Sequence, residues 1–123
     1  MGTHKINVDG ATSDDGRPSA VGVVIRDCRG VVVAASVKLL LAQYEVDVTE
    51  ALAIEEGILI ARQKMLKQVI IESNSLLVVD AISSNSSHGD LTPIILGILL
   101  LSFSLDTWKV KHLKRNTTKW LMS

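Results

Sequence analysis

Cysteine and aromatic residues are scarce in this sequence of 123 residues. Cys28 is the only cysteine, so the chain can form neither an internal disulfide nor a cysteine-based zinc site. A reducing compartment is therefore expected. Aromatic residues make up 3% of the chain, so stacking of aromatic rings on bases cannot be a main mode of ligand binding.

The chain also lacks a net charge. Thirteen Lys and Arg residues balance thirteen Asp and Glu residues, and the overall charge indicates no polyanionic partner. The cations are unevenly distributed, however, and no acidic residue follows Asp106. The C-terminal cluster consists of Lys109, Lys111, Lys114, Arg115 and Lys119. Two interpretations of this cluster stay open, a solvated face and a phosphate-binding surface.

No hydrophobic run is long enough to cross a membrane. The longest, residues 93–105, is too short for a bilayer core of about 30 Å and predicts a buried helix instead. The first residues lack the apolar stretch of a signal peptide. With 47% hydrophobic residues, the chain has enough apolar material for a core. We therefore expect one domain over residues 1–123 that is soluble, intracellular and monomeric, with no membrane partner.

The periodicity of apolar residues predicts an α/β fold. Alternation predicts strands at 6–9, 20–26 and 31–37, and a type I turn at 27–30 makes the three an antiparallel meander. Further elements are a helix starting at a capping box at 47–50, a strand at 68–72, a helix capped by Ser73 or Asn74, a helix with Pro93 in its first turn, a strand at 108–113 and a terminal helix from 117. The order β-β-β-α-β-α-α-β predicts a mixed five-stranded sheet packed with helices, in which the last two strands lie parallel to a neighbour.

Polar side chains at the ends of these elements are the candidate functional residues. Asp9 ends the first strand before Gly10, and Glu50 opens the first helix. The strand at 68–72 runs into Ser73-Asn74-Ser75, where an amide stands in place of a third carboxylate. Carboxylates gathered from strand ends and a helix are what two-metal phosphoryl chemistry requires.

Each of these residues also has a structural interpretation. Asp9 before glycine is a common turn residue, Glu50 can belong to the capping box, and Asn74 can cap a helix. His112, within a strand, is either structural or a phosphate contact, and His88 lies in a serine-rich loop. Trp108 and Trp120 are expected to pack in the core or at the terminus.

The ordered motifs of the chain resemble those of a ribonuclease H-type domain, most closely of the plant reverse-transcriptase-like branch of that family. The matching segments are Lys5-Ile6-Asn7-Val8-Asp9-Gly10-Ala11, Gly22-Val23-Val24-Ile25-Arg26-Asp27 with Gly30, Thr49-Glu50-Ala51-Leu52-Ala53, Ile71-Glu72-Ser73-Asn74-Ser75 and Val110-Lys111-His112-Leu113-Lys114-Arg115-Asn116. They occur in family order and span nearly the whole chain.

The resemblance implies a nuclease that cuts the RNA strand of an RNA/DNA hybrid with two Mg²⁺ or Mn²⁺ ions held by four acidic residues. It assigns the first two positions to Asp9 and Glu50, and the third falls on Asn74. The fourth belongs in the last helix, but residues 116–121 contain no acidic residue. Two carboxylates offset little of the charge of two divalent ions. Glu72, Asp14 and Asp15 are the carboxylates that could compensate.

Three functions follow from these residues. The first is an RNA/DNA hybrid ribonuclease with metal ligands Asp9, Glu50 and Asn74 and with nucleic-acid contacts from the C-terminal cluster. The second is a catalytically degenerate nucleic-acid-binding or interaction module, indicated by Asn74 and the missing fourth carboxylate. The third is a scaffold without a nucleic-acid role, indicated by the neutral net charge.

Overall fold

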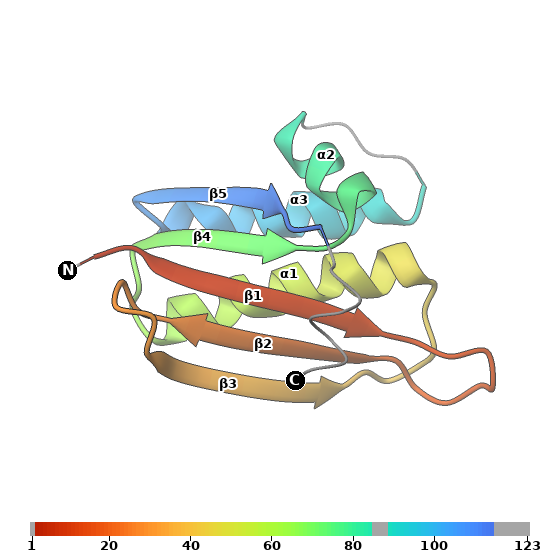
Figure 1. Cartoon of the computed structure of the whole chain (residues 1–123). Helices are drawn as coiled ribbons and strands as arrows, with labels where there is room; N and C mark the ends of the chain where they lie inside the picture. The colour runs from red at the N-terminus through yellow and green to blue at the C-terminus, as the bar shows by residue number, and fades with distance from the viewer. Residues whose placement is uncertain (1, 85–88, 115–123) are drawn as a thin grey trace.

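The first three strands form the expected antiparallel meander. The computed structural model describes residues 2–84 and 89–114. It contains β1 (His4–Ala11), β2 (Ala20–Arg26) and β3 (Val32–Leu39), paired in that order (Figure 1). In the turn before β3, the Gly30 N–H donates to the Asp27 carbonyl at 2.9 Å and Gly30 has a φ of 85°. Glycine adopts this left-handed conformation without steric cost.

The remaining elements complete a mixed sheet. They are α1 (Val46–Gln63), β4 (Gln68–Ser73), α2 (Leu76–Ser83), α3 (Leu91–Leu101), a 3₁₀ turn η1 (Ser102–Ser104) and β5 (Thr107–His112). Over the described residues the strand order is β3-β2-β1-β4-β5, with β4 parallel to β1 and β5 parallel to β4. The predicted element order and the parallel strands are confirmed. The terminal helix predicted from residue 117 lies outside the described residues.

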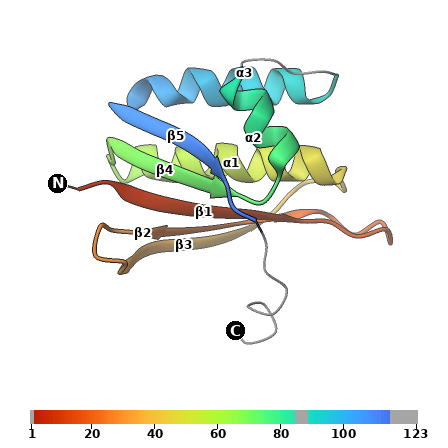
Figure 2. The same cartoon turned by 45° about the horizontal axis from the view of Figure 1, so that its top comes forward.

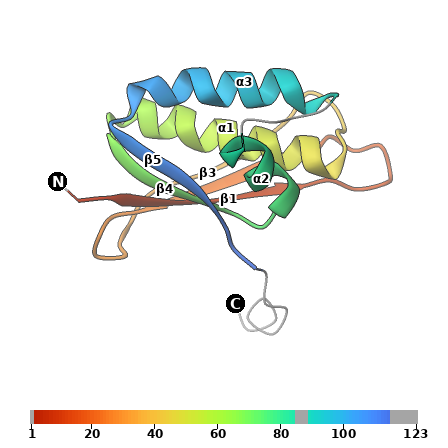
Figure 3. The same cartoon turned by 90° about the horizontal axis from the view of Figure 1, so that it is seen from above.

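The helices that the structure describes all cover the same face of the sheet. Figures 2 and 3 show α1, α2 and α3 on one side of the strands, and Figure 1 looks onto the other side. We call this second side the open face, because no helix within residues 2–84 and 89–114 lies on it. The sheet is twisted and open and does not close into a barrel.

The core lies between the sheet and α1. Alternate residues of β1, β2 and β4 point toward the helices and are buried, as are the inward residues of α1: Ile6, Val8, Val21, Val23, Ile25, Val69, Ile71, Ala51, Ile54, Ile58 and Ala61. At Gly57, an added Cβ would lie 3.0 Å from Val8 Cγ1 and 3.1 Å from Ile6 Cγ2. This close approach holds α1 against β1, antiparallel to it, so the first turns of α1 lie near the carboxyl end of β1.

Two predicted helix starts are wrong. α1 begins at Val46 after Glu45, whose side chain makes no capping bond, so residues 47–50 lie inside the first turns and do not form a capping box. The Thr49 hydroxyl instead donates to the Glu45 carbonyl at 2.8 Å. The cap of α2 is Ser75, whose hydroxyl accepts the Val78 N–H at 3.3 Å, rather than Ser73 or Asn74.

The apolar run predicted as one buried helix is shorter and only half buried. α3 ends at Leu101 and continues as the 3₁₀ turn η1. Ile95 and Ile98 are buried, whereas Leu100 is 68% and Phe103 84% exposed. The buried face of a helix is predicted from the spacing of apolar residues among polar ones. A run that is apolar on all sides gives no such pattern, so it cannot show which side is buried. Across the described segments, no helix is both long and apolar enough to span a bilayer.

Candidate active site

Asp9 lies near the carboxyl end of the central strand, on the open face. In β1 the buried residues Ile6 and Val8 point toward the helices, so Asn7 and Asp9 point to the opposite side. Across the ladder Asp9 pairs with Gly22 of β2. A Cβ at position 22 would have no neighbour closer than 4.0 Å, so the sheet beside the Asp9 carboxylate is left unfilled.

Glu50 is brought to the same end of β1 by α1. Its side chain is buried, with the residue only 4% exposed, and its Oε1 accepts the Gly10 N–H at 2.7 Å. The carboxylate therefore lies directly against the Asp9–Gly10 peptide. Gly10 makes the contact possible, since a Cβ there would stand 2.8 Å from the same Oε1. The interpretation of Glu50 as a capping-box residue is wrong, because its carboxylate contacts β1 and not the helix start.

Asn74 follows β4 at the neighbouring strand end. β1 and β4 run parallel, and their last paired residues are Asn7 and Glu72. Asp9 and Asn74 each come two residues further along these adjacent strands, toward the same edge of the sheet. Asn74 is half buried and does not cap α2, so the cap interpretation is wrong. The ends of β1 and β4 and the start of α1 thus supply two carboxylates and one amide.

These oxygen atoms are of the type that binds hard divalent cations, but together they carry little negative charge. Carboxylate and amide oxygens are the ligands that Mg²⁺ prefers. In the described part of the chain, no group of three or more His, Cys, Asp and Glu side chains is placed to hold a metal ion. The third position at this site is an amide, Asn74. A metal at this site would depend on Asp9, Glu50 and Asn74, with two negative charges between them.

Two of the three carboxylates expected to compensate, Glu72 and Asp15, have other partners, and Asp14 is exposed in the loop after β1. Glu72 Oε1 accepts the Asn7 side-chain N–H at 2.9 Å, and Glu72 Oε2 lies 3.8 Å from the Lys5 ammonium. Asp15 lies in the loop after β1, where bonds from the Ser13 hydroxyl and the Arg17 N–H hold its pKa below the usual range. A metal ion would therefore compete with these partners for either carboxylate.

The C-terminal cluster divides between the open face and the chain end. Lys109 and Lys111 of β5 pair with Ile70 and Glu72 of β4 and lie on the open face. Lys114 is exposed. Arg115 and Lys119 lie outside the described residues, as do His88 and Trp120.

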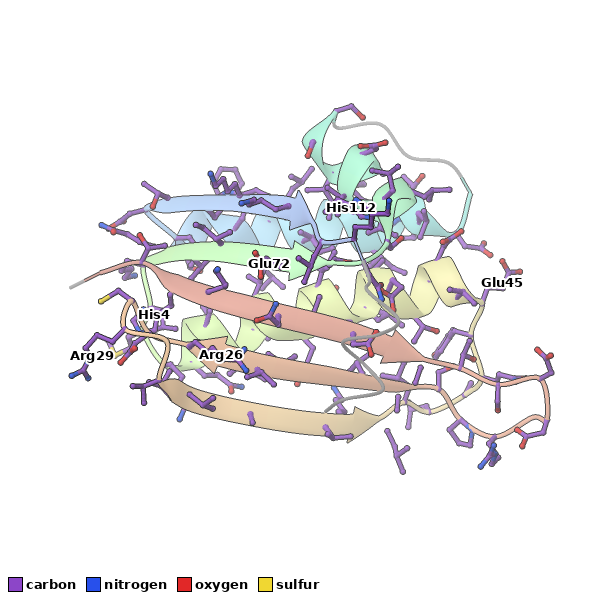
Figure 4. All side chains as sticks on the ribbon, in the orientation of Figure 1. His4, Arg26, Arg29, Glu45, Glu72 and His112 are labelled. Carbon is purple, nitrogen blue, oxygen red and sulfur yellow. The ribbon has the colours of Figure 1, made fainter. Side chains whose placement is uncertain are left out.

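Trp108 and His112, also singled out in the sequence, lie in β5 together with Lys109 and Lys111. Trp108 packs against the core, as expected. His112 is exposed at the end of β5, where it pairs with Ser73 (Figure 4). This position suits a surface contact and gives His112 no part in the core.

A polar network on the open face was not anticipated. The Arg26 guanidinium donates to Asn7 Oδ1 at 3.0 Å, and Asn7 in turn donates to Glu72. Figure 4 shows Arg26 and Glu72 above the strands on this face. The sequence predicted the three strands that contain Asn7, Arg26 and Glu72, but the strand register was needed to bring these side chains together.

Comparisons with known proteins agree with this fold. Three solved structures share the fold. The RNase H1 of the halophilic archaeon Halobacterium salinarum has a TM-score of 0.86 at 22% identity, covering 96% of this chain and 90% of that one. The N-terminal RNase H domain of a Mycobacterium tuberculosis protein has 0.85 at 19%, covering 98% and 88%. LC11-RNase H1, solved in complex with an RNA/DNA hybrid, has 0.81 at 20%, covering 91% and 86%.

Sequence comparison extends this from the fold to the family. No curated protein sequence matches the chain significantly. The profile of the reverse transcriptase-like family matches residues 7–120, which include Asp9, Glu50 and Asn74. The chain therefore belongs to the reverse transcriptase-like family and is a ribonuclease H-type domain.

Proposed function

We propose that this domain binds RNA/DNA hybrids and hydrolyses their RNA strand with divalent metal ions held by Asp9, Glu50 and Asn74. The observation that carries the proposal is the 2.7 Å bond from the Gly10 N–H to Glu50. It draws a buried carboxylate from α1 onto the strand end that bears Asp9. The solved hybrid complex of LC11-RNase H1, which shares the fold, supports the choice of substrate.

Bound divalent ions would activate a water molecule and stabilise the charge that develops on the departing oxygen. The role of the chain's own residues in this proposal is to supply and orient the oxygen atoms that hold these ions. Asp9 and Glu50 supply anionic oxygens from two different elements, and the Asn74 amide supplies a neutral oxygen. The Gly10 N–H fixes one oxygen of Glu50, so that carboxylate is oriented before any ligand arrives.

A second candidate is a nucleic-acid-binding module without catalysis. It is favoured by the amide at Asn74, which stands in place of a third carboxylate. Changes in the groups that merely support metal ligands cost about 10–100-fold in affinity or activity. Replacing a charged ligand by a neutral one is expected to cost at least as much.

Cleavage of a labelled RNA/DNA hybrid in Mg²⁺ separates the two candidates. The chain is compared with its Asn74→Asp variant and with an Asp9→Asn control. Cleavage by the chain that disappears in Asp9→Asn supports the nuclease. Cleavage by Asn74→Asp alone identifies a silenced nuclease. Binding of the hybrid without cleavage by any form supports the binding module. A well-folded protein that binds no hybrid at low salt would refute both.

A further inference from the structure

A serine without exposed surface joins two loops beside the candidate active site. Ser19 lies in the loop between β1 and β2 and is 0% exposed. Its backbone N–H donates to the Ala42 carbonyl at 3.0 Å, and its carbonyl accepts the Leu40 N–H at 2.8 Å. Both partners belong to the segment that leads from β3 into α1 (Figure 1). The β1–β2 loop therefore holds the segment from which α1 starts.

The Ser19 side chain closes a ring of hydrogen bonds with Thr12 and Tyr44. The Tyr44 N–H donates to Ser19 Oγ at 2.8 Å, and the Thr12 hydroxyl donates to the Tyr44 carbonyl at 2.8 Å. The two hydroxyl oxygens lie 2.8 Å apart, whereas Ser19 Oγ lies 3.4 Å from the Tyr44 carbonyl. Because Thr12 gives its single proton to Tyr44, Ser19 donates to Thr12. Each hydroxyl both donates and accepts, and hydrogen bonds connected in this way strengthen one another.

The ring fixes the start of α1, the helix that carries Glu50. Tyr44 directly precedes Glu45, the cap position of α1. The Glu45 carbonyl accepts the Thr49 N–H at 2.9 Å and the Thr49 hydroxyl at 2.8 Å. Thr49 in turn lies against β1, because a Cβ at Gly10 would stand 2.8 Å from its Cγ2. A shift of Tyr44 would therefore move the first turns of α1, and Glu50 with them, relative to the Gly10 N–H.

We propose that Ser19 is a positioning residue of the candidate active site, which keeps the Glu50 carboxylate on the Gly10 N–H through this ring of hydrogen bonds. Because Ser19 has no exposed surface, it does not touch a bound ligand and acts on the site only through the start of α1. The consequence for metal binding rests on the proposed function. The effect on the bond between Gly10 and Glu50 does not.

Hydrogen exchange of the Gly10 amide, followed by NMR in the absence of metal, measures the bond to Glu50 directly. Ser19→Ala removes the hydroxyl and opens the ring. The exchange rate of the Gly10 amide is expected to rise by about tenfold, because a hydrogen bond to a charged group is weakened. The rate is taken relative to that of Ile71, a buried residue of β4 that reports unfolding of the whole domain. This ratio separates a change at the site from a general loss of stability.

Variants of Thr12 provide a second way to open the ring. Thr12→Val removes the hydroxyl at nearly unchanged shape and is expected to raise the exchange ratio as Ser19→Ala does. Thr12→Ser keeps a hydroxyl and is expected to behave like the unsubstituted chain. Ser13→Ala is the matched control, because the Ser13 hydroxyl donates to Asp15 in the same loop and lies outside the ring.

Calorimetric titration with Mg²⁺ tests the consequence for the site. Ser19→Ala and Thr12→Val are expected to bind Mg²⁺ about 10-fold more weakly, as on loss of a group that orients a metal ligand. An exchange ratio or a Mg²⁺ affinity that both variants share with Ser13→Ala would overturn the inference. If the exchange ratio rises but the unsubstituted chain binds no Mg²⁺, the proposed metal site is wrong and the positioning of Glu50 stands. A raised ratio together with weakened Mg²⁺ binding in these two variants supports the inference.

Discussion

Substitution of Gly10 by alanine tests how tightly α1 presses Glu50 against β1. The new Cβ would stand 2.8 Å from Glu50 Oε1, 2.8 Å from Thr49 Cγ2 and 3.0 Å from the Thr49 carbonyl carbon, where ordinary contacts begin at 3.4 Å. The Glu50 side chain can swing away, but the Thr49 backbone moves only with the helix. Relief of the clash therefore displaces the start of α1 by about 0.5 Å, against the packing of Gly57 on the same strand.

Two costs add in this variant. Overpacking a well-packed contact costs about 1–3 kcal/mol. The Gly10 N–H donates to a buried carboxylate, and a hydrogen bond to a charged group contributes about 1.5–3 kcal/mol. Because a small shift weakens this bond without removing it, the expected loss in free energy of unfolding is about 2–4 kcal/mol. That is a substantial part of the 5–15 kcal/mol typical of a domain.

Urea unfolding followed by circular dichroism measures the loss, with Gly22→Ala as the matched control. Gly22 lies in β2 across from Asp9, and a Cβ there meets nothing closer than 4.0 Å. Alanine in an unstrained strand position is more stable than glycine by about 0.5–1 kcal/mol. The two substitutions are thus expected to act in opposite directions. A Gly10→Ala variant within 0.5 kcal/mol of the unsubstituted chain would show that α1 does not hold Glu50 in place.

Three further predictions concern single side chains. Asn74→Asp is expected to raise Mg²⁺ affinity at least tenfold by adding a charged ligand; equal affinity in calorimetry would contradict this. Ser75→Ala removes the cap of α2 and is expected to lower the free energy of unfolding by about 1 kcal/mol. An unchanged midpoint of urea unfolding would contradict this. Burial raises the pKa of Glu55, so its stabilising contribution is complete below its ordinary pKa of 4.5 and is lost as pH rises through the raised value. Glu55→Gln should therefore be the more stable protein at neutral pH, with the difference shrinking toward pH 4; a constant difference across this range would refute the assignment.

The order of the strands along the chain and the antiparallel pairing of β1, β2 and β3 could be predicted because their patterns are local. Alternation marked β1 and β2, and the Asp27 to Gly30 turn joined β2 to β3. The start of α1 could not be predicted in this way. Its cap position, Glu45, makes no side-chain capping bond, while the residues that resemble a capping box, 47–50, lie inside the helix.

The sequence indicated which residues form the candidate site, but it did not indicate which atoms they contact. Asp9, Glu50 and Asn74 stand out by motif, but Glu50 had two interpretations until its bond to Gly10, 40 residues away, excluded one. The Asn7–Glu72 bond spans 65 residues and depends on the parallel register of β1 and β4. No local pattern specifies such a register, because β2, β3 and α1 separate β1 from β4 in the sequence.

The central position of β1 has a consequence for synthesis of the chain on the ribosome. β1 pairs with β2 within the first 26 residues, but its other edge waits for β4, since Asn7 pairs with Glu72. At about 5–20 residues per second, that edge stays unpaired for about 3 to 13 s. An unpaired strand edge is a template for association with other chains. The strand that bears Asp9 therefore keeps one edge unpaired until β4 has emerged, and the candidate site at its carboxyl end is completed only then.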